Sequence, residues 1–228
     1  MAKNVNKTED KIVAVEEALS RSEHFIENNQ KTLSIVIGVI IIVVLGYFGY
    51  QKFYVTPMEK EARSQMFMAE MYFAKDSLDL ALNGDGNYLG FLDIIDQYGS
   101  SKPAKLANYY AGICLLKKGE FENAIDYLKS YSIKDKVIAA MATGAIGDAY
   151  LELKDYKKAS TYYLEAAEKD NNSFTSPIFL LKAGRAYEIQ QEYSKAAVTY
   201  ERILNEYKLS MEARNIEKDI ARAQGLAK

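Results

Sequence analysis

The chain has 228 residues, of which 49% are apolar, so it can bury a core and is not broadly disordered. A formal charge of -2 leaves no excess of basic residues to neutralise phosphates, which argues against nucleic acid as a main partner. Cys114 is the one cysteine, so an intrachain disulfide and a cluster of thiolate metal ligands are both excluded.

The first 31 residues are polar and mixed in charge, and we treat residues 1–31 as a short head segment. Two interpretations remain open for this head. It is either a partly ordered tail or a small amphipathic helix that lies on a membrane or on a partner. The apolar residues that raise the second possibility are Ile12, Val13, Val15, Ala18, Leu19, Phe25 and Ile26.

The 18 residues 33–50, LSIVIGVIIIVVLGYFGY, contain no charge. As a helix this stretch would be about 27 Å long, close to the thickness of the hydrocarbon layer of a membrane. Aromatic residues continue to Tyr54, as is typical of a membrane interface. We therefore predict that residues 32–54 form a transmembrane anchor. A cleaved signal peptide is disfavoured because the head is long and no small-residue cleavage site follows.

The flanking charges leave the orientation of this anchor open. Arg21 and Lys31 lie on the N-terminal side, and Lys52, Lys60 and Arg63 lie on the C-terminal side. The excess of basic residues that marks the cytosolic side of a membrane protein is therefore too small to decide between the two orientations.

Residues 55–104 are predicted to form an irregular first helix pair. Thr56 and Glu59 have the spacing of a capping box around a first-turn proline, so we expect a helix to start here and to run to about residue 82. The loop 83–87 resembles a calcium site, but an EF-hand needs glycine at Tyr88 and glutamate at Ile94, so we interpret the loop as a turn. A second helix is expected around 91–98.

Three glycines, Gly112, Gly147 and Gly184, stand 35 and 37 residues apart and mark a repeat. Small residues at position 8, the glycine, and at position 20 would let helices approach closely, and large residues at positions 11, 17 and 24 would fill the remaining space. Position 27 is also part of the repeated pattern. The recurring residues at positions 11, 17, 20, 24 and 27 are Leu115, Phe121, Ala124, Leu128 and Tyr131, then Tyr150, Tyr156, Ala159, Tyr163 and Ala166, then Tyr187, Tyr193, Ala196, Tyr200 and Ile203.

This pattern resembles the tetratricopeptide repeat (TPR), whose period is about 34 residues. It implies three TPR repeats over 105–208, with Ser176 and Pro177 as the N-cap and first-turn proline of the third, and a capping helix over 209–228. The consensus proline at position 32 is replaced by Asn171 and Lys208 in the last two copies. The predicted fold class is all-α, with a single N-terminal transmembrane helix followed by a TPR-like α-solenoid.

In TPR arrays, the first helix of each pair lines a concave groove, commonly through positions 2, 5, 9, 12 and 13. The groove expected here is apolar with scattered charges of both signs, although some of these residues could instead pack against the next helix. The candidate protein-binding residues are Leu106, Tyr109, Ile113, Lys117, Met141, Asp148, Glu152, Ile178, Leu181, Arg185 and Glu188, with Leu116, Gly144, Leu151 and Ile189 at the remaining positions.

No motif for catalysis, phosphate binding or metal binding is found in the sequence. His24 lies in a polar stretch beside the anchor, where we expect a solvated or interfacial side chain. Cys114 falls inside a repeat helix, where a small buried hydrophobe fits better than a nucleophile. We therefore expect no catalytic residue, no cofactor, no metal and no small-molecule substrate.

The layout also resembles a narrower family, the YfgM-like ancillary subunits of the SecYEG translocon. The resemblance lies in the segment from Phe25 to Lys31 that leads into the anchor, in the aromatic residues from Tyr47 to Tyr54, and in the repeats that follow. It implies a bacterial inner-membrane protein with a cytosolic N-terminus and periplasmic repeats. The implied partners are the translocon, a membrane-anchored periplasmic chaperone of the PpiD type, and emerging polypeptides.

Two alternatives remain open at this point. The chain could be a TPR assembly platform for another envelope complex, such as a division machine, without a translocon role. It could also be an enzyme with an unrecognised motif, which would require a pocket with converging polar groups.

Overall fold

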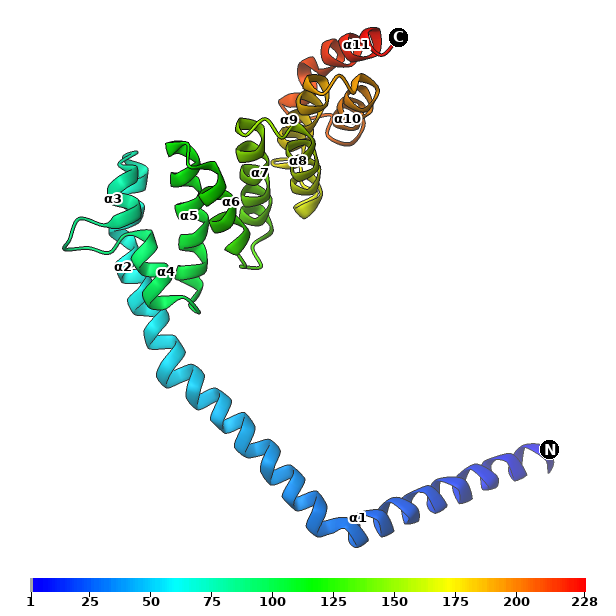
Figure 1. The fold of residues 1–228 in the computed structure, drawn as a ribbon. Helices are drawn as coiled ribbons and strands as arrows, with labels where there is room; N and C mark the ends of the chain where they lie inside the picture. Colours follow the sequence, from blue (N-terminus) through cyan, green and yellow to red (C-terminus); the bar gives the residue numbers. More distant parts are fainter. Residues whose placement is uncertain (1) are drawn as a thin grey trace. The chain divides into compact units, whose positions relative to one another are not determined.

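The computed structural model describes the backbone of residues 2–228 and the side chains of residues 20, 21, 23 and 25–228. Throughout this described part the regular structure is helical, without a strand (Figure 1). The chain separates into two units, one ending at Pro57 and the other beginning at Met58. The predicted all-α fold class is confirmed.

The first unit contains α1 (Ala2–Tyr50) and a π-helical turn, η1 (Gln51–Val55). From Phe25 onward the helix is long and apolar enough to cross a membrane. Its most apolar 18-residue stretch has a mean hydropathy of 2.5, and no residue of that stretch is buried. Ile42, for example, is 70% exposed. A continuous apolar surface of this kind is costly in water, so a lipid environment suits it. The side chains of Ile12, Val13, Val15, Ala18, Leu19 and His24, on which the sequence raised expectations, lie outside the described residues.

The α-helix predicted to start at Thr56 does begin there, but the prediction that Thr56 is its N-cap is wrong. Thr56 has helical dihedral angles, and both its backbone N–H and its hydroxyl donate to the Gln51 carbonyl, the hydroxyl at 2.9 Å. The chain thus passes from η1 straight into α2 (Thr56–Ala74). A wider π turn accommodates Pro57, because proline has no N–H and its ring would clash with the carbonyl four residues earlier.

The first helix of the second unit also ends earlier than expected. It stops at Ala74 because Asp76 adopts a left-handed conformation, with φ 58°, and the Ser77 N–H donates back to the Tyr72 carbonyl at 2.9 Å. Two short helices follow, α3 (Leu78–Asn83) and α4 (Phe91–Tyr98). The predicted helix to residue 82 is therefore two helices, separated by an αL turn that aspartate tolerates.

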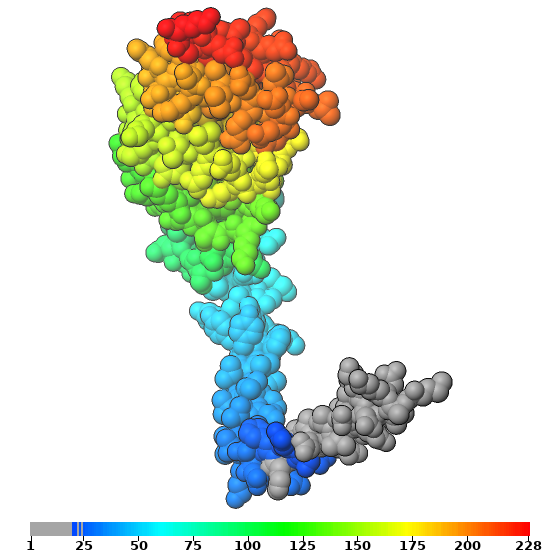
Figure 2. All heavy atoms as spheres, turned by 90° about the vertical axis from the view of Figure 1, so that its right-hand side faces the viewer, coloured from blue at the N-terminus to red at the C-terminus, as the bar shows by residue number. Residues whose placement is uncertain are grey.

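Residues 102–206 form three antiparallel helix pairs (Figure 1). The pairs follow one another in chain order, as the succession of colours from green to orange shows (Figure 2). Large apolar side chains and small ones from neighbouring helices form the core between them. The pairs are α5 (Lys102–Lys118) with α6 (Phe121–Ser130), α7 (Lys136–Glu152) with α8 (Tyr156–Asp170), and α9 (Ser176–Ile189) with α10 (Tyr193–Glu206), followed by η2 (Glu212–Asn215) and α11 (Ile216–Leu226).

The close approach predicted at position 8 is present in all three pairs. A Cβ atom on Gly184 would lie 2.2 Å from the Tyr200 ring, and one on Gly147 would lie 2.7 Å from the Tyr163 ring. The same addition at Gly112 would place a Cβ 2.5 Å from a side-chain carbon of Leu128. The glycine at position 8 and the large residue at position 24 therefore pack directly against each other. Position 20 is fully buried alanine in each copy, at Ala124, Ala159 and Ala196.

The start of the third pair differs from the prediction. Thr175 is the N-cap of α9, and Ser176 is its first residue. The Ser176 hydroxyl donates to the Ala167 carbonyl at 2.7 Å, so it ties α9 to the preceding helix instead of capping its own. Asn171 ends α8 with φ 45°, a backbone angle that proline is unable to adopt, which explains why the consensus proline is missing there.

Candidate protein-binding groove

The first helices of the three pairs, α5, α7 and α9, bring several predicted residues together around one cavity of about 270 Å³, here called the main groove cavity. Its predicted members come from all three helices, and its other lining residues are apolar except Thr175 and Lys182. The predicted members are Tyr109, Ile113, Leu116, Met141, Asp148 and Ile178, and the others are Ala145, Phe174, Thr175, Phe179 and Lys182.

A neighbouring cavity of about 360 Å³, here called the distal cavity, shares Asp148 and Lys182 with the main groove cavity. It adds Arg185, a predicted residue, together with Leu151 and Ile189 from the same helix faces. Because the two cavities share residues, they form adjacent parts of one groove over α7 and α9.

The shared polar residues are held in a fixed arrangement. Lys182 Nζ donates to both carboxylate oxygens of Asp148, at 2.7 and 2.9 Å, and the Tyr163 hydroxyl donates to the same carboxylate at 2.6 Å. Burial, followed by the Asp148 charge, raises the pKa of Tyr163, so the phenol stays protonated and remains a donor. The Lys182 ammonium also lies 6.0 Å from the centre of the Phe179 ring. The groove floor thus presents one paired charge between apolar walls.

Sequence reasoning missed Lys182 and Phe174. Lys182 stands at position 6 of its repeat, which is not one of the five groove positions considered above. A signal was nevertheless present, because Lys182 lies one repeat length, 34 residues, after the oppositely charged Asp148, with which it pairs. Phe174 lies in the α8–α9 loop and is 71% exposed. The side chain of Asn172 accepts the backbone N–H groups of Phe174 and Thr175, both at 2.7 Å, which fixes the loop and holds the phenylalanine at the cavity.

The other predicted residues lie outside both cavities. Lys117 pairs with Asp76 at 2.7 Å, and Glu188 pairs with Arg222 of α11 at 3.0 Å. The remaining three are Leu181, which packs against the core, Glu152, which is exposed, and Leu106, which lines a different cavity.

Cys114 is fully buried in the core formed by α2 to α6, as the sequence predicted. Burial raises the pKa of its thiol to about 11, so at neutral pH it is protonated and poorly nucleophilic. Within the described residues, no group of three or more His, Cys, Asp or Glu side chains is arranged to hold a metal ion.

Comparison with known families agrees with this geometry. Residues 145–210 match the tetratricopeptide repeat family, and this stretch contains the two glycines Gly147 and Gly184 that pack against tyrosine. A tetratricopeptide repeat is therefore present, and the fold is that of a TPR-type α-solenoid. Such repeats are in general non-catalytic scaffolds for protein interaction. A search of curated proteins finds no match to the chain.

Proposed function

We propose that this chain is a membrane-anchored, non-catalytic scaffold that holds an apolar polypeptide segment of a partner in the groove over α5, α7 and α9. The main groove cavity carries this proposal, because exposed or half-buried apolar side chains from three consecutive repeats line it together. Met141 is 41% exposed and Phe174 is 71% exposed, so their apolar surface is available to a partner. A segment with apolar side chains would bury this surface on binding.

We further propose that the scaffold belongs to the Sec translocon of the bacterial inner membrane. In this proposal residues 1–31 are a cytosolic head, residues 32–54 are the anchor, and the repeats over 105–208 lie in the periplasm with flanking segments 55–104 and 209–228. The head and anchor would dock on a SecYEG-type channel, and the groove would engage a PpiD-type chaperone or emerging polypeptides. The long apolar helix ahead of the repeats supports the membrane anchor, and the tetratricopeptide repeat over 145–210 supports the scaffold role. The placement at the translocon rests on the resemblance of residues 25–54 described under the sequence analysis.

Site-specific photo-crosslinking in native membranes tests the groove. A crosslinker at Ile178, in the main groove cavity, should capture a periplasmic chaperone or a nascent polypeptide. The matched control is Lys157, which is exposed on α8, the second helix of its pair, and should capture neither. Ile178→Arg should abolish capture from a second crosslinker at Met141, because a long charged side chain would replace apolar surface in the cavity and an apolar segment could no longer bury against it. Equal capture from Ile178 and Lys157 would contradict a groove function.

Deletion of residues 1–31 separates the translocon proposal from a platform for another envelope complex. The deletion should abolish recovery of the SecYEG channel while the groove still captures the chaperone. Recovery of neither channel nor chaperone from the full chain, with another envelope complex in their place, would favour the platform. A reporter fused after Lys228 that is active only outside the cytosol should be active, and an inactive reporter would overturn the proposed orientation.

A further inference from the structure

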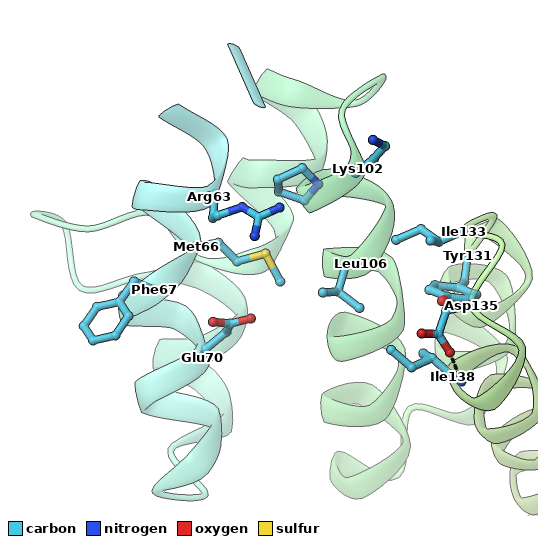
Figure 3. Close-up of a pocket in the computed structure, with 11 residues that line it drawn as sticks. Arg63, Met66, Phe67, Glu70, Lys102, Leu106, Tyr131, Ile133, Asp135 and Ile138 are labelled. Carbon is cyan, nitrogen blue, oxygen red and sulfur yellow. Dashed lines mark hydrogen bonds between the residues drawn. The ribbon is translucent and has the colours of Figure 1, made fainter. Parts of the chain in front are cut away.

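A third cavity, of about 480 Å³, lies between α2 and α5 and outside the groove (Figure 3). We call it the α2–α5 cavity. Its volume is within the range of about 300–1,000 Å³ that is typical of ligand sites. Its walls are mainly apolar, and they include Met66 of α2, Leu106 of α5 and Ile138 of α7. Apolar side chains of a partner can therefore enter between these helices.

Charged side chains surround this cavity in an ordered way. Arg63 and Lys102 lie at one end, and Glu70 lies at the other (Figure 3). Within the part of the chain whose side chains are described, none of the three has an ion-pair partner within 4.0 Å. At the C-terminal end of α5, by contrast, Lys117 pairs with Asp76 at 2.7 Å. Burial raises the pKa of Glu70, and Arg63 opposes this only in part, so this carboxylate is partly desolvated without a close cation.

We propose that the α2–α5 cavity docks an amphipathic helix of a partner protein, with an acidic residue facing Arg63 and Lys102, a basic residue facing Glu70, and apolar side chains between them. Arg63 and Glu70 are seven residues apart on α2, which is two helical turns or about 10 Å. A helix that lies along α2 would meet both ends with charges about seven residues apart. This surface is separate from the groove, and the proposal does not depend on what the groove binds.

Charge complementarity selects this occupant over others. A segment with acidic residues at both ends would meet Glu70 with a like charge, and a segment with basic residues at both ends would meet Arg63 and Lys102 in the same way. Asp135, which also lines the cavity, accepts the Ile138 N–H at 2.9 Å as a helix cap but keeps its negative charge, so it adds to the repulsion of an acidic segment. Of the three kinds of segment, the mixed-charge helix is the one that opposes no like charge at Arg63, Lys102 or Glu70.

Three synthetic helical peptides test the proposal against the full chain in lipid nanodiscs. Each has the same leucine pair, flanked seven residues apart by Glu and Lys, by two Glu, or by two Lys. Titration should show the mixed peptide binding the wild type about tenfold more tightly than either like-charged peptide. Glu70→Arg should make the doubly acidic peptide the tightest ligand. Equal binding of the three peptides, or an unchanged order in Glu70→Arg, would overturn the proposal.

Two further variants locate the binding site. Leu106→Arg, inside the α2–α5 cavity, should weaken all three peptides, whereas Ile178→Arg, in the main groove cavity, should leave them unchanged. If Ile178→Arg instead weakens binding and Leu106→Arg does not, the peptides occupy the groove and the proposal is wrong. Circular dichroism of each variant checks that it is folded. Glu70→Gln, which keeps the shape of the side chain, should reduce the preference for the mixed peptide even if Glu70→Arg does not fold.

Discussion

At the residue scale, the three repeats share one backbone feature that their sequences do not share. The turn between the helices of each pair contains one left-handed residue, which is Gly119 in the first pair, Lys154 in the second and Gln191 in the third, with φ of 83°, 61° and 61°. The next residue in each pair donates its N–H to the carbonyl five residues earlier, at 2.9 Å in all three. Only the first pair has glycine at this position, the residue that adopts a left-handed conformation without steric cost.

Introducing glycine at this left-handed position should therefore stabilise the chain, and removing glycine from it should destabilise the chain. Lys154→Gly should raise the free energy of unfolding by roughly 1 kcal/mol, because it removes the strain of a left-handed residue with a Cβ. Gly119→Ala should lower it by about 1–2 kcal/mol for the same reason. Thermal unfolding of the detergent-solubilised chain, followed by circular dichroism, measures both. Shifts of the same sign in the two variants would show that the turns are not equivalent.

Two tyrosine hydroxyls provide a second contrast. The Tyr163 hydroxyl donates to the Asp148 carboxylate, whereas the Tyr131 hydroxyl is buried without a hydrogen-bond partner among the described residues. Tyr163→Phe should cost about 1.5–3 kcal/mol of unfolding free energy, as is usual for a hydrogen bond to a charged group. Tyr131→Phe should be neutral or stabilising by up to about 1 kcal/mol. Thermal melts of the pair check this, and a large loss in Tyr131→Phe would reveal a partner such as an ordered water.

At the scale of the element, the contact between helices of one pair could be predicted from the sequence. The recurrence of glycine with a large residue 16 positions later indicated close packing, and the contacts of Gly184 with Tyr200 and of Gly147 with Tyr163 confirm it. The ends of helices were less predictable. The helix continues through Pro57 by means of a π turn, and it ends before Asp76, which adopts a left-handed conformation. Each outcome depends on whether continuing the helix or ending it gives the lower free energy, and the local sequence alone does not decide this.

The irregular first helix pair predicted over residues 55–104 contains a truncated copy of the repeat, which the sequence indicated only weakly. Asp76 occupies the left-handed position at the end of α2, and the alanines seven residues before and five residues after it, Ala69 and Ala81, are both fully buried. Gly112 and Ala124 have the same offsets from Gly119. The resemblance is weak in the sequence because the left-handed positions are 43 residues apart at this junction and the loop after α3 interrupts the second helix. The α2–α5 cavity, which involves this irregular copy, was therefore not predicted.

The helix contact is tested by adding one methyl group. Gly184→Ala should destabilise the chain by about 1–3 kcal/mol, because the Cβ would overlap the Tyr200 ring and the helices would have to move apart. The matched control is Gly225→Ala in α11, where nothing lies within 4 Å of the added atom. That change should be neutral or stabilising by about 0.5–1 kcal/mol, since alanine is the better helix former. Thermal unfolding compares the two, and equal shifts would contradict the role assigned to position 8.

At the scale of the whole molecule, ion pairs connect the second repeat to the third and the third repeat to α11. Lys182 of α9 pairs with Asp148 of α7, and Arg222 of α11 pairs with Glu188 of α9, and the partners are 34 residues apart in both cases. The ion pair between Arg222 and Glu188 repeats the spacing of the pair between Lys182 and Asp148, so α11 occupies the place of the first helix of a further repeat. Its other face is polar, as expected of a helix that ends a stack in water.

Because the helix pairs are stacked, we expect a destabilising substitution in α11 to lower the stability of neighbouring helices only. Ile216 of α11 is buried against α9 and α10, so Ile216→Ala should cost about 2–5 kcal/mol, as is usual for emptying a buried isoleucine site. Because each pair contacts mainly its neighbours, amide hydrogen exchange should speed up in α9 to α11 and stay unchanged in α4 to α6. Leu226→Ala, at a residue that is 54% exposed, is the control and should change neither region. A uniform loss of protection from α4 to α11 would show that the helix pairs unfold as one cooperative unit.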